Sequence, residues 1–336
     1  MGKSVSLKKK LMGNALIRFA RSIRFNRQPR AAILLYHRVA DFCSDPYQLN
    51  VSPLHFSQQM ELLKQTCVPM HLLQFAQALR TRSYPDRSIV VTFDDGYVDN
   101  LNSALPVLEC AGIPATIFIT TGYIGSSKEF WWEKLARILL STVFVSDHLQ
   151  LVIREKLYDW PTATLPQRQI ALRQLHKILR ELPEFEREVI LDDLAGREAQ
   201  EGQGSSQPTF DRIMTQPELV KLVESNYVEV GAHSISHPFL SSLRVEEQHA
   251  EIVGSREVLK NMIGKPINSF SYPFGNYNDE TLEIVRNAGF SAAVTTNYGR
   301  SQVGDDPFRL RRCTVNDWNI DQFKIKLESF FNDRDE

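Results

Sequence analysis

The chain has 336 residues, of which 43% are hydrophobic and 24% are charged, as in an ordinary globular protein. Its formal net charge of −1 gives it no overall basic character, and we expect no nucleic-acid partner. No stretch of about 18 apolar residues occurs, which excludes a membrane-spanning helix. The cysteines show no C-x-x-C spacing and predict a reducing compartment, not a disulfide framework; they are Cys43, Cys67, Cys110 and Cys313.

Residues 1–30 carry nine cations and no acidic residue. Within them, residues 7–25 have apolar side chains at helical spacing with cations on the other side, which predicts a basic amphipathic helix on an anionic membrane surface. A disordered basic tail is the alternative. The segment lacks the uninterrupted apolar core of a signal peptide, so we expect a cytoplasmic protein, peripheral on the inner membrane face.

From residue 31 onward, short buried-type runs alternate with helical patterns. The predicted strands are residues 31–36, 88–92, 113–119, 228–230, 267–272, 291–295 and 309–315. One predicted helix begins at the cap formed by Ser52 and Pro53, and the others cover residues 101–111, 217–225, 245–263, 279–288 and 321–331. Residues 125–215 break the alternation. Helical patterns at 130–140 and 167–182 and a polar run at 197–207 predict a mostly helical insertion that ends in a flexible loop.

Seven buried runs alternating with helices indicate parallel strands joined by right-handed crossovers. The predicted fold class is α/β, as a (β/α) barrel over residues 31–336 that the insertion interrupts. A doubly wound open sheet is the alternative. In a barrel, residues at the carboxyl ends of the strands open onto one face. We therefore expect the polar and turn residues at such ends to meet: His37, Asp94, Asp95, His233, Pro273 and Phe274.

The strand at 88–92 runs into two adjacent carboxylates, Asp94 and Asp95, and then Gly96. Burying two neighbouring carboxylates costs several kcal/mol unless a cation compensates. A metal ion would compensate the charge and leave one carboxylate free as a base. A surface Asp-Asp-Gly turn that closes a hairpin is the alternative.

His233 and His237 are four residues apart, as in a helical metal pair, but the sequence between them argues against a helix. Pro238 disfavours the helical conformation at His237, and no Glu follows His233 as in the motif H-E-x-x-H. Both imidazoles are better placed on a strand-end loop. Two His and one Asp with open positions are typical of a catalytic metal site.

Three segments resemble motifs of the polysaccharide deacetylase family (NodB homology, carbohydrate esterases). They are Thr92-Phe-Asp-Asp-Gly96, His233-Ser-Ile-Ser-His237 and Ser271-Tyr-Pro-Phe-Gly275. The resemblance covers about residues 31–124 and 212–330. It implies a distorted (β/α)7 barrel of the NodB-homology type and a metal-dependent deacetylase.

The resemblance also implies roles for single residues. Asp94 is expected to be the general base, and Asp95, His233 and His237 the ligands of one divalent metal ion, Zn2+ or alternatively Co2+. The expected substrate-binding residues are Tyr97, Pro273 and Phe274, and the backbone N–H of Phe274 is the expected oxyanion donor.

Two departures from the family pattern leave roles open. No Arg precedes Pro273 to hold the base, and Arg309, Arg311 and Arg312 on the last strand are all candidates. No His follows His249, so the late Leu-x-His motif that supplies the general acid is missing. A subgroup acting on exported poly-N-acetylglucosamine carries a His on its first strand. By that resemblance His37 is the candidate acid, and a packing role for His37 is the alternative.

The resulting hypothesis is a hydrolase that removes N-acetyl, or alternatively O-acetyl, groups from a glycan or lipid-linked saccharide of the cell envelope. A metal-dependent phosphoesterase and a non-catalytic carbohydrate-binding relative are the alternatives. Metal stoichiometry distinguishes the first of these, since phosphoester chemistry favours two ions and more Asp and His ligands. The intact Asp94-Asp95 pair and the two histidines count against the second.

Overall fold

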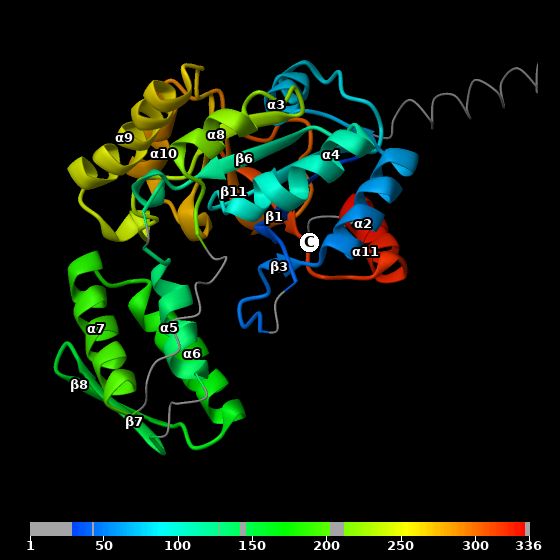
Figure 1. The fold of residues 1–336 in the computed structure, drawn as a ribbon. Helices are drawn as coiled ribbons and strands as arrows, with labels where there is room; N and C mark the ends of the chain where they lie inside the picture. Colours follow the sequence, from blue (N-terminus) through cyan, green and yellow to red (C-terminus); the bar gives the residue numbers. More distant parts are fainter. Residues whose placement is uncertain (1–28, 42–43, 127, 142–145, 202–211, 333–336) are drawn as a thin grey trace, which may run out of the picture.

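The computed structural model describes residues 29–41, 44–126, 128–141, 146–201 and 212–332 (Figure 1). The predicted amphipathic helix at residues 7–25 lies outside the described residues. Among the helices that are described, none combines the length and the apolar character needed to cross a membrane. The three described cysteines, Cys67, Cys110 and Cys313, are free thiols.

Seven parallel strands close into a barrel, which confirms the predicted fold and not the open sheet. Their order is β1-β12-β11-β10-β9-β6-β5, and the pairing of β5 with β1 completes the ring. A short eighth strand, β4 (Val68–Pro69), pairs with β5 outside the ring. The strands of the ring are β1 (Ala31–Tyr36), β5 (Ser88–Phe93), β6 (Ala115–Ile119), β9 (Val228–Ala232), β10 (Ser269–Ser271), β11 (Ala292–Tyr298) and β12 (Leu310–Thr314).

The pairing register explains why distant residues share one end of the barrel. All residues of β1 and β5 are buried, as expected for parallel strands covered on both faces. Tyr36 is the partner of Phe93, and Leu35 of Thr314. The segments that follow β1, β5 and β12 therefore leave the barrel side by side, at the end where barrel enzymes place their chemistry.

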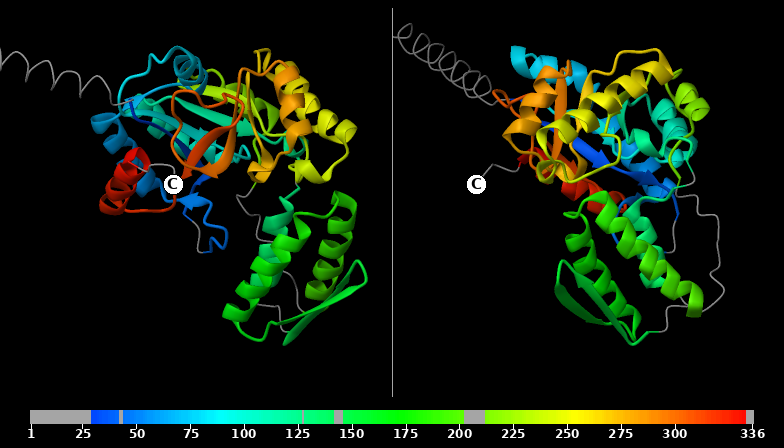
Figure 2. Two further views of the ribbon diagram at one scale, coloured as in Figure 1. Left: turned by 180° about the vertical axis from the view of Figure 1, so that it is seen from behind. Right: turned by 90° about the vertical axis from the view of Figure 1, so that its left-hand side faces the viewer.

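Helices cover the outside of the barrel (Figure 2). They are α2 (Pro53–Thr66), α3 (Leu72–Thr81), α4 (Leu105–Ala111), α8 (Gln216–Leu222), α9 (Val245–Ile263), α10 (Asp279–Asn287) and α11 (Ile320–Asn332). The predicted cap of α2 is present: Ser52 Oγ accepts a hydrogen bond from the backbone N–H of His55. The helix predicted at 101–111 is α4 preceded by a π-helical segment, Asn100–Ala104. The sequence patterns missed α3, β4 and the short pair β2 (Arg38–Val39) and β3 (Asn50–Val51).

The insertion forms a lobe beside the carboxyl end of the barrel (Figure 2). It contains α5 (Trp131–Leu140), α6 (Leu165–Leu179) and α7 (Glu184–Glu201), so it is mostly helical as predicted. An antiparallel hairpin was not predicted, β7 (His148–Ile153) with β8 (Lys156–Pro161). The prediction of a loop at residues 197–207 is wrong for residues 197–201, which belong to α7. Residues 202–211 lie outside the described part.

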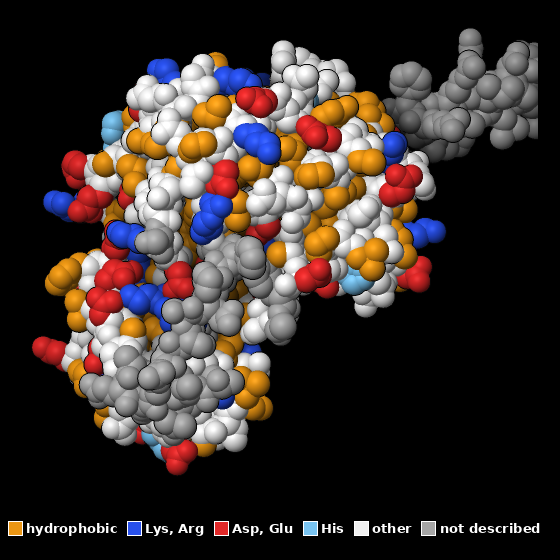
Figure 3. Space-filling view, viewed as in Figure 1, with side chains coloured by type: hydrophobic (Ala, Val, Ile, Leu, Met, Phe, Trp, Pro, Cys, Tyr) orange, Lys and Arg blue, Asp and Glu red, His pale blue; other side chains and the backbone are white. Residues whose placement is uncertain are grey.

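The insertion has its own hydrophobic core, which continues into the barrel. Leucines from α5, α6 and α7 pack together, and Tyr97 and Ile213 of the barrel belong to the same cluster. An isolated antiparallel bridge links Tyr97 to Ile213. On the face seen in Figure 3, hydrophobic side chains are scattered among charged side chains of both signs over the barrel and the insertion.

Candidate functional site

The loop after β5 places Asp94 and Asp95 inside the barrel mouth. The backbone N–H of Asp94 donates to Tyr36 O at 3.0 Å, which fixes this loop against the end of β1. Asp95 has a φ of 74°, a left-handed conformation that is costly for a residue with a side chain. Gly96 follows with a φ of 84°, and a Cβ there would lie 2.8 Å from Cδ1 of Ile119. Glycine is therefore required where the second carboxylate turns inward.

The loop after β9 carries His233 and His237, which confirms that the two imidazoles do not lie on a helix. His237 has a φ of 56°, and its N–H donates to Ser234 Oγ at 3.1 Å. The carboxylate of Glu251, on α9, accepts hydrogen bonds from the backbone N–H groups of Ile235 and Ser236 at 2.7 and 2.9 Å. These bonds hold the loop so that both rings face the loop after β5.

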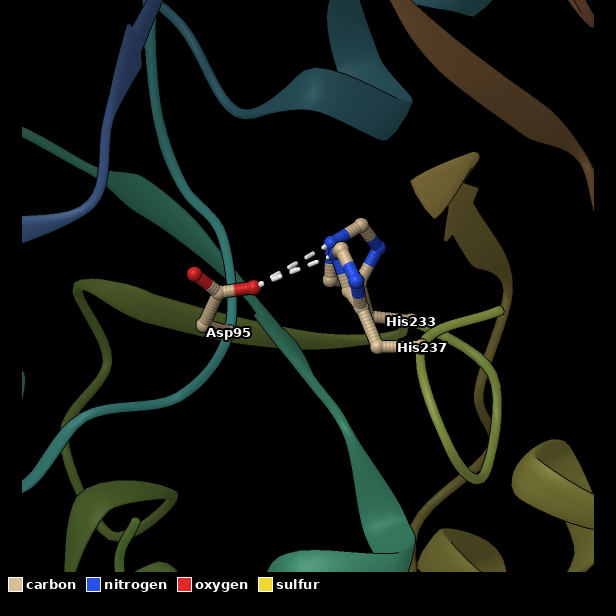
Figure 4. A group of neighbouring side chains, drawn as sticks. All are labelled: Asp95, His233 and His237. Atoms are coloured by element: carbon tan, nitrogen blue, oxygen red, sulfur yellow. Dashed lines mark ion pairs between the residues drawn. The ribbon is translucent and has the colours of Figure 1, made fainter. Parts of the chain in front are cut away.

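Asp95, His233 and His237 form one buried cluster (Figure 4). Asp95 Oδ1 lies 3.5 Å from Nε2 of each histidine, and one ligand atom from each residue falls within 4.8 Å of the others. Oδ1 has no hydrogen-bond partner among the described residues, although it is buried. An orphaned buried carboxylate oxygen facing two imidazole nitrogens fits a cation.

The partner of His233 suits ligation by Nε2, whereas Nδ1 of His237 is buried without a hydrogen-bond partner among the described residues. Nδ1 of His233 lies 2.8 Å from the backbone oxygen of Ser271, which favours a proton on Nδ1 and leaves Nε2 free. Burial and the nearby charge of His233 lower the pKa of His237 to about 3, so this ring is neutral, as a metal ligand must be. Burial also lowers the pKa of His233, but the charges of Asp94 and Asp95 outweigh it and raise the pKa above its ordinary value.

Asp94 is held by Arg312 from the middle of β12, which decides between the three candidate arginines. The guanidinium donates two hydrogen bonds to the Asp94 carboxylate, at 2.8 and 2.6 Å, in the bidentate geometry typical of Arg. It also donates to Thr92 Oγ1, Ser271 Oγ and the backbone oxygen of Thr295. Arg309 instead pairs with Asp306 at the surface.

This arrangement keeps the Asp94 carboxylate ionised. Burial alone raises the pKa of a carboxyl group. The charges of Arg312 and His233, together with the bonds from Arg312, outweigh burial and hold the pKa of Asp94 well below its usual range. Asp94 is therefore an oriented anion beside the candidate metal cluster, not a member of it.

His37 follows β1 and lies half-buried at the same end of the barrel. Its backbone oxygen accepts a hydrogen bond from Asn100 Nδ2 at 2.8 Å. Burial lowers the pKa of His37, and the charges of Asp95 and Asp94 oppose this effect. The role of His37 as the general acid stays a prediction.

The residues predicted to bind substrate differ in their accessibility. The role of Tyr97 in substrate binding stays a prediction: its ring is fully buried, its hydroxyl donates to Glu133 at 2.8 Å, and Arg38 lies 4.2 Å from the ring centre. Pro273 is buried at the turn after β10. Phe274 is half-buried with a φ of 56°, and its ring centre lies 4.5 Å from that of His237. Phe274 thus remains a candidate.

Sequence patterns missed the contribution of the insertion to the site. Trp132 packs against His237 with ring centres 4.8 Å apart, and Phe130 stacks on Trp132 at 4.2 Å. Glu133, next in the chain, bonds to Tyr97 and Arg38 of the barrel. The run Phe130-Trp-Trp-Glu133 opens a predicted helix and resembles ordinary core sequence, so only its three-dimensional position shows that it reaches the site.

Comparisons with known proteins agree on one family. The family model described as polysaccharide deacetylase matches residues 81–171 and 198–293, more than half of the chain. YxkH of Bacillus subtilis (strain 168), a protein named for the same family, is 22% identical over 298 residues, covering 87% of this chain and 74% of that protein.

Solved structures show the same fold. The deacetylase PplD of Streptococcus pyogenes, solved in complex with acetate, superposes with a TM-score of 0.59 at 18% identity, covering 90% of this chain and 99% of PplD. IcaB of Ammonifex degensii superposes with a TM-score of 0.58 at 20% identity, covering 89% of this chain and 96% of IcaB. At these identities the likeness concerns the barrel fold alone.

Proposed function

The chain belongs to the polysaccharide deacetylase family, and from this premise we propose that it uses one divalent metal ion to remove N-acetyl groups from a glycan or lipid-linked saccharide of the cell envelope. The observation that carries the proposal is the pairing of two carboxylates in different surroundings. Asp95 faces two imidazoles with an orphaned oxygen, whereas Asp94 is locked by Arg312. One carboxylate is thus suited to ligation and its neighbour to proton transfer.

The proposed ligands are Asp95, His233 and His237. Two imidazoles and one carboxylate with open positions suit Zn2+, with Co2+ as the alternative. The ion would supply Lewis-acid polarisation of the acetyl carbonyl and favour ionisation of the attacking water.

Asp94 is the proposed general base. Its carboxylate accepts a proton from the attacking water, while Arg312 keeps the carboxylate ionised and fixes its orientation before substrate arrives. Ser271 Oγ lies 3.1 Å from the Oδ2 atom of Asp94 and supports the same orientation. The Oδ2 atom accepts from both Arg312 and Ser271, whereas Oδ1 accepts one bond from Arg312 and keeps a second lone pair for the incoming proton.

His37 is the proposed acid for the leaving nitrogen. The C–N bond of an acetamide breaks only as the nitrogen gains a proton, because an amide anion is a poor leaving group. Since the pKa of His37 is lowered by burial, the imidazole needs a nearby proton source, and the proton that Asp94 takes from water is one. The backbone N–H of Phe274 is the proposed donor to the oxyanion that develops on the acetyl oxygen.

The described residues do not favour phosphoester chemistry. Within the described ranges, the cluster of Asp95, His233 and His237 is the one group of three or more His, Cys, Asp or Glu side chains arranged to hold a metal ion. A two-metal phosphoesterase needs a second set of ligands about 3.5–4 Å from the first ion.

The test combines metal content with acetate release. We expect the full chain, freed of metal and reloaded with Zn2+, to bind one ion and to release acetate from one or more members of a panel of acetylated glycans and glycolipids. Asp94→Asn should keep the ion but lose turnover by about 10²–10⁴-fold. Two bound ions, or loss of the ion in Asp94→Asn with retention in Asp95→Asn, would contradict the assigned roles.

A further inference from the structure

The proposed catalytic groups are almost fully buried in the structure. The exposed fractions are 2% for Asp94, 2% for Asp95, 1% for His233 and 5% for His237. A continuous polysaccharide that lies across a site needs a groove open at both ends. These four residues lie at the mouth of the barrel, so something other than the barrel strands must cover them.

The insertion supplies part of this cover. The chain enters it through α5, which begins next to the barrel mouth and leads away into the lobe (Figure 1). At the start of that segment, Trp132 and Phe130 lie with ring centres 4.8 and 6.0 Å from the ring centre of His237. Phe274 covers His237 from the side of β10. Its ring centre lies 4.5 Å from that of His237 and 6.0 Å from that of Trp132.

This cover is anchored to the barrel by a buried network. Glu133 Oε1 accepts hydrogen bonds from the Tyr97 hydroxyl at 2.8 Å and from Arg38 Nη1 at 3.3 Å. Arg38 also pairs with Asp99 at 3.0 Å, and all of these side chains are at least 85% buried. Because Glu133 follows Trp132 directly, the network anchors the backbone that carries the indole beside His237.

The indole of Trp132 also offers a polar atom without an assigned role. Its Nε1 is buried and has no acceptor among the described residues. A buried donor left without an acceptor costs about 1–3 kcal/mol, so native structures rarely tolerate one that nothing ever satisfies. The ring centre of Trp132 lies 4.8 Å from that of His237, so an oxygen of a ligand bound beside His237 is a candidate acceptor.

We infer that Trp132 makes the insertion part of the active site, closing it into a pocket for an acetylated unit at the end of a short or lipid-linked saccharide, with the indole N–H donating to an oxygen of that unit. The inference rests on the proposed deacetylase activity and narrows its substrate class. A chain end enters a covered pocket, whereas an internal unit of a long polymer has a neighbour on both sides and collides with the wall formed by Trp132 and Phe274.

Three variants of the full chain distinguish three effects: loss of the aromatic wall, loss of its hydrogen-bond donor, and lower stability of the insertion. Trp132→Ala removes both the wall and the donor, and Trp132→Phe keeps an aromatic wall without the N–H. Trp160→Ala is the matched control: Trp160 is a buried tryptophan of the same lobe, but its Nε1 bonds to Gln174 at 2.7 Å and its ring stacks on Tyr158. It weakens the lobe without opening the site.

The first measurement is the position of deacetylation along N-acetylglucosamine oligomers of two to six units, mapped by mass spectrometry with the Zn2+-loaded enzyme. We expect the wild type and Trp160→Ala to act on a terminal unit. In Trp132→Ala the ratio of internal to terminal deacetylation should rise at least tenfold. Trp132→Phe should keep the terminal preference while kcat/KM falls about tenfold, as for one lost hydrogen bond. Equal rates at internal and terminal units in the wild type would overturn the inference.

A second measurement does not depend on activity. Carbethoxylation of single histidines by diethyl pyrocarbonate is followed in the chelator-treated protein, with exposed His148 as the internal standard. His237 should react at least tenfold faster in Trp132→Ala than in the wild type and in Trp160→Ala. Equal rates would overturn the pocket. If His237 is protected as expected but the wild type releases no acetate from any substrate, the proposed function fails and the closed pocket stands.

Discussion

Replacing Arg312 by Met tests the central electrostatic argument, because this guanidinium is the main support of the proposed base. Arg312 is fully buried and donates to Asp94, Thr92, Ser271 and the backbone oxygen of Thr295. Methionine fills similar space without charge or donors. Removing one partner of a buried ion pair leaves the other charge uncompensated and typically costs about 3–5 kcal/mol. We expect Arg312→Met to lose that much free energy of unfolding at pH 7.

The loss should depend on pH in a defined direction. In the wild type, the pKa of Asp94 in the folded protein lies below its ordinary value of 3.8, so its contribution to stability is present above that value and is lost as the pH falls below it. In Arg312→Met, burial acts with less opposition and raises the pKa of Asp94. The variant is then penalised at neutral pH, where Asp94 must ionise, and less so when the carboxyl is protonated.

Urea unfolding with a chelator present, at pH 7 and at pH 5, measures this difference. The gap in unfolding free energy between wild type and Arg312→Met should be smaller at pH 5. In the loaded enzyme, turnover should fall about 10²–10⁴-fold at neutral pH, and the acidic limb of the pH–rate profile should move to higher pH. Ser271→Ala is the matched control: it removes a neutral donor 3.1 Å from Asp94 and should cost only about 0.5–1.5 kcal/mol. An unshifted acidic limb in Arg312→Met would refute the reasoning.

Four further outcomes are expected. His237→Ala should lose stoichiometric metal together with activity; full metal retention when His233→Ala is added would remove the site assignment. His37→Ala should lose about 10²-fold or more on an N-acetyl sugar but little on an activated aryl acetate, whose phenolate leaves without a proton; equal losses with a lower Tm would make His37 a packing residue. Glu133→Gln should weaken the contact of the insertion with the barrel by about 1–3 kcal/mol, seen as faster proteolysis of the lobe at an unchanged rate elsewhere; equal proteolysis would show that the network does not anchor it. Deleting residues 1–29, which lie outside the described structure apart from residue 29, should reduce salt-sensitive binding to anionic liposomes, on which the predicted membrane contact and location depend; unchanged binding would leave the segment a plain tail.

The strands and helices that the sequence predicted well are those with strong local signals. The buried run at residues 31–36 is β1 with the same bounds, and the helix at 245–263 is α9 with the same bounds, ended by Gly264 at a φ of 67°. The missed elements have weak local signals. Strands β2, β3 and β4 have two residues each, too few for a period to show. The hairpin of β7 and β8 carries exposed apolar residues such as Val152 and Leu157, which obscure its alternation.

The candidate metal cluster was predictable because its residues are chemically distinctive. An Asp-Asp-Gly turn after a buried strand and two histidines before a proline differ from the average loop, and both follow strands that the sequence located correctly. The burial of Tyr97, in contrast, was not predictable from the sequence. Its position next to the acidic turn suggested exposure to substrate, but the insertion buries it, and the contact with Glu133 joins residues 36 positions apart.

The contact of Arg312 with the proposed base Asp94 is the feature of the site that the order of residues along the chain predicts least. Arg312 is 218 residues from Asp94, and its strand precedes only the last helix, so nothing local distinguishes it from Arg309 or Arg311. Closure of the barrel determines that Arg312 is the arginine that reaches Asp94. Strand β1 pairs with β5 on one side and β12 on the other, so the first, second and last strands of the ring become neighbours. The register pairs Leu34 with Cys313 on one side and with Val91 on the other, so the neighbouring Arg312 lies close to β5, and its buried side chain reaches forward to Asp94. A guanidinium supplied from β12 can then hold Asp94 while the turn after β10 carries no arginine. Because the geometry of the pair matters to the chemistry and the strand of origin does not, the missing arginine before Pro273 is no argument against a working base.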